Sequence, residues 1–146
     1  MTIKASTGLR NSVLATGSLA AALAGGRVNI YSGSAPATAD AAVTGTLLCS
    51  VSLNSTATGI DMDTTAVNGV LSKAPAQVWS GVNAATGTAS YYRHVGATDD
   101  GTSSTTQPRL QGDVGLSGAD LNISSVSLTS GATQTVDFYS VALPTL

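Results

Sequence analysis

The feature that most constrains the fold of this chain is its lack of the charged side chains that usually cover helices in water. There is no Glu among its 146 residues, all eight acids are Asp, and Lys occurs only at positions 4 and 73. Ala, Ser, Thr and Gly together supply more than half of the residues. Helix surfaces favour Glu, Lys, Gln and Arg, whereas Ser, Thr and Gly suit strands and turns. The composition therefore predicts an all-β domain with many short loops, long enough to enclose one core.

One region departs from this pattern, because residues 7–24 have the apolar spacing of a helix. The residues that would share one face are Leu9, Val13, Thr16, Ala20 and Leu23. Thr7 can cap the start, Ser18 can cap a second helix after Gly17, and Gly25-Gly26 can end the region. We expect residues 1–26 to form an N-terminal helical arm and residues 27–146 to form a single β-sandwich domain.

After residue 26 the apolar residues alternate, most clearly over residues 46–53. About eight such segments follow one another at 8–12-residue spacing, separated by polar turns. This spacing is typical of a jelly-roll-like or related antiparallel β-sandwich.

The apolar runs are shorter than the roughly 20 residues that a membrane-spanning helix needs. Lys4 and Arg10 before an apolar stretch, with Ala22-Leu23-Ala24 after it, also resemble a secretory signal. Four residues of this stretch interrupt its apolar core: Ser12, Thr16, Gly17 and Ser18. We therefore favour a structural helix and expect no membrane partner.

The charge balance bears on possible partners. A net charge of −2 and four scattered arginines do not form the basic patch that nucleic-acid binding requires. Only 10% of the residues are charged and the mean hydropathy is +0.24, so a free monomer would have a poorly hydrated surface. Either another subunit covers much of this surface, which we favour, or serine and threonine hydroxyls keep it soluble.

The sequence offers few groups for catalysis. His94 is the only histidine, and no G-x-S-x-G motif accompanies it. A Ser-His-Asp triad on His94 stays open, but a strand histidine hydrogen-bonded to a neighbour is the simpler expectation. Cys49 is a lone cysteine on the apolar face of residues 47–53, so we expect a small buried hydrophobe. We predict no catalytic residue and no cofactor.

Two pairs of aspartates could offer oxygen ligands to calcium: Asp61 with Asp63, and Asp99 with Asp100. Neither pair fits the twelve-residue calcium loop, and Asp in loops rich in Ser, Thr and Gly usually stabilises local turns. We predict no metal site.

The aromatic residues could form a platform for a sugar or a receptor. Tyr91 and Tyr92 must point to opposite faces of one strand, so they cannot share a platform. Trp79 is expected in the core, with an interface role as the alternative.

Several segments of the chain resemble a family of small virion proteins of tailed bacteriophages. The segments are Leu9-Arg10-Asn11, Ala15-Thr16-Gly17-Ser18, the Ile30–Asp40 stretch, Gly115–Asn122 and Val136–Pro144. The resemblance implies a non-enzymatic capsid decoration (cement) protein, made in the bacterial host cytoplasm and carried on the capsid surface. It would form a dimer or trimer and bind over joints between major capsid protein subunits. The alternative is a tail or fibre component that contacts a host receptor, and an enzyme that degrades the host wall is a third class.

We expect the contact surface to include Leu9, Arg10, Val13, Leu14, Leu23, Trp79 and Tyr92. In this hypothesis residues 1–26 reach across to a neighbouring subunit or to the shell. Deleting them would then abolish particle binding and leave a folded β-domain.

Overall fold

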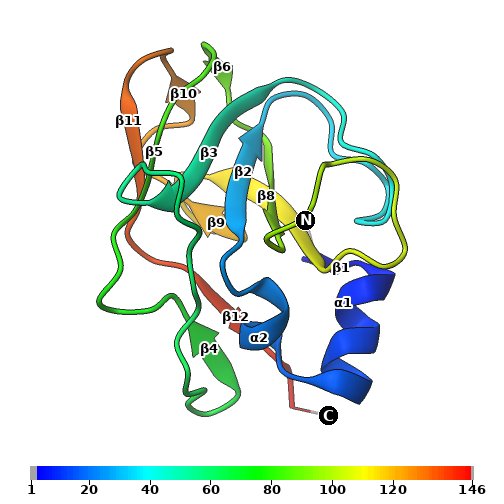
Figure 1. Ribbon diagram of the computed structural model, residues 1–146. Helices are drawn as coiled ribbons and strands as arrows, with labels where there is room; N and C mark the ends of the chain where they lie inside the picture. Colours follow the sequence, from blue (N-terminus) through cyan, green and yellow to red (C-terminus); the bar gives the residue numbers. More distant parts are fainter. Residues whose placement is uncertain (1–2, 146) are drawn as a thin grey trace.

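The computed structural model describes residues 3–145 and consists mostly of strands (Figure 1). The helical elements are α1 (Thr7–Asn11), the π-helical turn η1 (Ser12–Thr16) and α2 (Leu19–Leu23). The strands are β1 (Lys4–Ala5), β2 (Arg27–Tyr31), β3 (Leu47–Leu53), β4 (Val70–Ser72), β5 (Trp79–Val82), β6 (Gly87–Thr88), β7 (Tyr91–Val95), β8 (Arg109–Gly115), β9 (Leu121–Asn122), β10 (Ser127–Leu128), β11 (Thr133–Val136) and β12 (Ser140–Ala142). The all-β class with a short N-terminal helical segment is confirmed.

The main sheet has the order β1-β8-β7-β2-β3-β5-β11, and β9 lies beside β8. Its neighbours are antiparallel except for the β8–β9 pair, which is parallel. Two small antiparallel pairs, β10 with β6 and β12 with β4, complete the fold. β1 is thus an edge strand of the main sheet, paired with β8.

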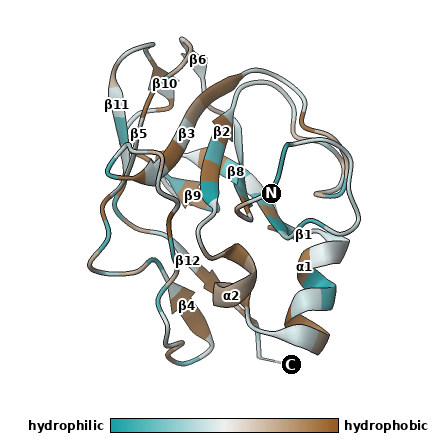
Figure 2. Ribbon diagram, in the orientation of Figure 1, coloured by the Kyte–Doolittle hydropathy of each residue, from teal (hydrophilic) through white to brown (hydrophobic). Residues whose placement is uncertain are grey.

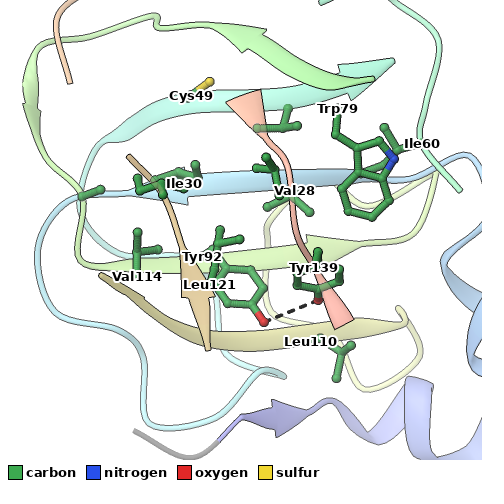
Figure 3. Packing of buried hydrophobic residues seen from close by; sticks show 14 of the residues in the cluster. Val28, Ile30, Cys49, Ile60, Trp79, Tyr92, Leu110, Val114, Leu121 and Tyr139 are labelled. Carbon is green, nitrogen blue, oxygen red and sulfur yellow. Dashed lines mark hydrogen bonds between the residues drawn. The ribbon is translucent and has the colours of Figure 1, made fainter. Parts of the chain in front are cut away.

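Alternation along the strands gives the main sheet two different faces. Val28 and Ile30 of β2 lie opposite Val51 and Cys49 of β3, and all four are buried on the same side. Tyr92 of β7 joins this apolar layer, as Figure 3 shows. Cys49 is fully buried in this layer, so the expectation of a small buried hydrophobe is confirmed. Burial also raises the pKa of its thiol to about 11.

The opposite face of the sheet carries buried polar side chains beneath two long loops. Arg93 of β7 and Gln111 of β8 are neighbours there, and the Arg93 Nε donates to Gln111 Oε1 at 2.9 Å. Gln111 in turn donates to the Pro36 carbonyl at 2.8 Å. The loops of residues 32–46 and 96–108 lie side by side over this face (Figure 1), joined by main-chain hydrogen bonds.

The N-terminal segment packs on its own sheet and is not a free arm. Leu9 of α1 and Leu23 of α2 belong to the main core. Ser6, not Thr7, caps α1, because its hydroxyl accepts the Leu9 N–H at 3.1 Å. Ser18 caps α2 as expected. The predicted helical region is therefore present, divided into short pieces that share the core of the β-domain.

Candidate functional site

The structure separates the seven predicted contact residues into two groups. Four are buried: Leu9, Leu23, Trp79 and Tyr92. For Leu23, Trp79 and Tyr92 the predicted interface role is wrong, because their side chains fill the core of the molecule itself. Leu9 is buried too, but it also lines the groove described below. Arg10 and Leu14 are exposed and Val13 is partly exposed. These three lie together along one apolar groove.

The groove has a volume of about 570 Å³. It lies between the N-terminal helical segment and the end of the chain that follows β12. Its lining comprises Ile3, Ala5, Leu9, Arg10, Val13, Leu14, Leu19, Leu110, Val141, Ala142, Leu143 and Pro144. A second hollow of about 300 Å³ shares Val13, Leu19, Val141 and Leu143 with it and extends the apolar surface towards β4. Figure 2 shows the same concentration of hydrophobic residues on α2, β4 and β12.

Local sequence explains why apolar side chains remain on the rim. The η1 turn closes with the Gly17 N–H donating to the Ser12 carbonyl at 2.9 Å. Leu14, within this turn, is 85% exposed, and Leu143 on the opposite wall is 75% exposed. The Leu143 N–H donates to the Gly69 carbonyl at 3.0 Å, which fixes that wall beside β4. Two large aliphatic side chains are thus held in water at one site, which is typical of a protein contact surface.

Arg10 is the one charged residue of the groove lining. Its guanidinium donates to the Thr7 hydroxyl at 2.9 Å. The groove thus combines an aliphatic floor with a single cation, an arrangement suited to binding an apolar group that has an acid beside it.

His94 lies in the core, and the expected hydrogen bond to a neighbour is wrong. Neither of its ring nitrogens has a hydrogen-bond partner within residues 3–145. Its ring packs against Trp79 and Tyr139, with ring centroids 5.7 and 5.4 Å away. Burial lowers the pKa of the imidazole to about 3. A general base needs a nucleophile within hydrogen-bond reach, and His94 has none in the described chain.

The aspartates considered for calcium are engaged by the protein itself. Asp99 forms a buried two-point ion pair with Arg109, through Nε and through Nη2 at 2.9 Å. Asp100 accepts from the Thr102 N–H and hydroxyl, which lowers the pKa of its carboxyl. Asp61 accepts from the Gly25 N–H and from the Gln77 amide, at 2.9 Å each. Across residues 3–145 no three His, Cys or acidic side chains gather as metal ligands do.

The aromatic residues also lie inside. Tyr31 and Tyr91 stack with ring centroids 5.0 Å apart on the polar face of the sheet, and both are buried. Tyr92 lies on the core face, so the prediction of opposite faces for Tyr91 and Tyr92 is confirmed. Phe138 is instead 88% exposed.

Sequence reasoning missed two features. The first is the buried polar layer of Arg93, Arg109 and Gln111, which the alternation of polar residues with Leu110 along β8 could have indicated. The second is the exposed Phe138, which strand alternation would have placed on the same buried face as Val136, two residues earlier.

No family model, curated protein sequence or solved structure matches this chain. Among the described residues no helix is long and apolar enough to span a membrane. The apolar groove, with Leu14 and Leu143 exposed on its rim, is the best candidate for a functional site.

Proposed function

We propose that this chain is a non-enzymatic structural protein of a bacteriophage virion that decorates the assembled capsid. It binds over joints between major capsid protein subunits and stabilises the shell. The observation that carries the proposal is the apolar groove, whose rim residues Leu14 and Leu143 are held in water on a chain with few charges. Such a surface supports a contact with neighbouring protein subunits in a particle.

The physical basis of the function is mass action. A protein that binds the assembled shell but not its separated subunits stabilises the shell, without any chemical step. The resemblance of residues 9–11, 15–18, 30–40, 115–122 and 136–144 to small tailed-phage virion proteins supports the same role.

The alternative, a tail or fibre component that binds a receptor, predicts an exposed aromatic cluster. Trp79 and all four tyrosines are buried, and Phe138 is the one large aromatic exposed in residues 3–145. A single exposed ring does not form an aromatic platform, so the burial of the other aromatic residues favours the decoration role over receptor binding.

The test compares capsids assembled without this protein before and after the purified chain is added. We expect saturable binding and a higher temperature of capsid disruption. Leu14→Asp, on the groove rim, should weaken binding at least about tenfold, because it places a charge in an apolar contact. Leu116→Asp changes a residue that is exposed outside the groove, and serves as the matched control. Capsids that bind none of the protein, or that gain no stability, would contradict the proposal.

A further inference from the structure

Phe138 is the most exposed large hydrophobic residue of the described chain, and it is the chain's only phenylalanine. It lies between the end of β11 and the start of β12. Its neighbours Val136 and Tyr139 are both buried, and the Tyr139 carbonyl accepts the Lys73 N–H at 2.8 Å. The backbone on each side is therefore anchored while the ring stands in water. An aromatic side chain presented in this way is typical of the anchor of a protein contact.

Phe138 does not reach the groove of its own chain. The groove is lined by the N-terminal segment, Leu110 and residues 141–144, and Phe138 is not among them. Phe138 instead borders a separate shallow hollow, together with Lys73 and Pro75. The exposed ring and the open groove are thus two distinct surfaces of one molecule, and only another molecule can bring them together.

Each surface carries a charge that can pair with one on the other; the remaining charge of the Phe138 surface, Lys73, donates to main-chain carbonyls of its own chain. Arg10 is the single charged residue in the groove lining, and Asp137 directly precedes Phe138 and is exposed. An apolar ring with an adjacent carboxylate matches an aliphatic groove with a guanidinium on its rim. Opposite charges at the edge of an apolar contact set its register and select its partner.

We propose that the groove receives the Asp137–Phe138 corner of a second copy of this chain. The Phe138 ring packs among the aliphatic side chains of the groove, and the Asp137 carboxylate pairs with Arg10 of the copy that provides the groove. Two copies can each insert Phe138 into the groove of the other and form a dimer. Alternatively, each copy can insert it into the groove of the next copy and form a closed ring. This inference rests on the proposed function in one respect: the groove that supports a contact in the particle is here filled by a neighbouring copy of the chain. The self-contact itself is measured on the isolated protein.

The first test measures the molar mass of the purified chain by sedimentation equilibrium over a concentration series. We expect a concentration-dependent oligomer, and Phe138→Ala should raise its dissociation constant roughly 30-fold or more, as expected for an anchor residue. Leu116→Ala removes an exposed aliphatic side chain outside both surfaces and should leave the constant unchanged. A wild-type chain that stays monomeric up to about 100 μM would overturn the proposal.

The second test reverses the charges. Arg10→Glu and Asp137→Arg should each weaken the oligomer, and the double variant should restore it, because the pair is then rebuilt with opposite signs. Thermal unfolding of each variant checks that the monomer still folds. Failure of the double variant to recover association contradicts the proposed pairing. A monomeric chain that still binds capsids refutes the self-contact and leaves the proposed function standing. An oligomer that binds no capsid refutes the proposed function and leaves the self-contact standing.

Discussion

At the scale of single residues, His94 places both ring nitrogens in the core with no hydrogen-bond partner in residues 3–145. The neutral imidazole is tolerated there, but its protonated form would be a buried charge without a counter-ion. Burial holds the pKa in the folded state at about 3, against 6.5 for a solvated imidazole. The folded chain therefore binds fewer protons than the unfolded chain between these two values.

This difference predicts a pH dependence of stability. The free energy of unfolding should be constant above about pH 7 and fall below pH 6.5, by up to about 1.4 kcal/mol per pH unit. Asp40 and Asp113 have lowered carboxyl pKa values, so their contribution to stability is lost only at more acidic pH. Burial raises the carboxyl pKa of Asp120, which acts on stability in the opposite direction. The contribution of His94 is therefore the difference in urea unfolding between the wild type and a His94 variant at about pH 5 to 6.5.

His94→Phe is the matched variant, because it keeps an aromatic ring beside Trp79 and Tyr139 and removes the titrating group. It should abolish the slope between about pH 5 and 6.5, and it should raise stability at pH 7 by about 1 kcal/mol by removing unpaired polar atoms. An unchanged slope in this variant would show that His94 is not the group responsible.

The ion pair of Asp99 and Arg109 makes a second prediction at this scale. Both side chains are buried, and Arg109 also donates to the Thr102 carbonyl at 2.6 Å. Asp99→Asn leaves a buried guanidinium without its counter-charge, so we expect a loss of about 3 kcal/mol in the free energy of unfolding. Asp100→Asn, in the same loop but solvent-exposed, is the control and should cost much less.

At the scale of elements, the N-terminal segment joins two leucines with opposite roles. Leu23 is fully buried, whereas Leu14 is 85% exposed. Leu23→Ala should lower the free energy of unfolding by about 2–5 kcal/mol through the cavity it creates. Leu14→Ala should change it by less than about 0.5 kcal/mol, and chemical denaturation measures both.

The comparison of Leu23→Ala with Leu14→Ala also tests whether residues 1–26 are a separable arm. If residues 1–26 were a separable arm, as the sequence suggested, Leu23→Ala would be as mild as Leu14→Ala. The packing of Leu9 and Leu23 in the main core predicts instead that deletion of the segment prevents folding of the β-domain.

Local patterns explain why this region could be predicted only in part. The helical spacing of residues 7–24 and the cap at Ser18 were readable from the sequence, because they depend on near neighbours. The π-helical turn at Ser12–Thr16 changes which side chains face the sheet. As a result Leu9 and Leu23 turn inward while Val13 and Leu14 border the groove, which the spacing alone could not assign.

At the scale of the whole molecule, the all-β class followed from composition and from the alternation of residues 46–53. The groove could not be predicted, because Ile3, Leu14 and Leu143 meet only after the two ends of the chain come together beside β8. The pattern of β7 likewise placed His94 on a strand, but it could not show that its ring nitrogens have no hydrogen-bond partner within residues 3–145.

We propose that this chain covers a phage capsid as a decoration protein. The most direct test is its copy number in purified virions, from quantitative gel densitometry against the major capsid protein. We predict a ratio near one copy for each major capsid protein subunit. A few to a few tens of copies in each particle would contradict the claim and place the chain at a tail or a vertex.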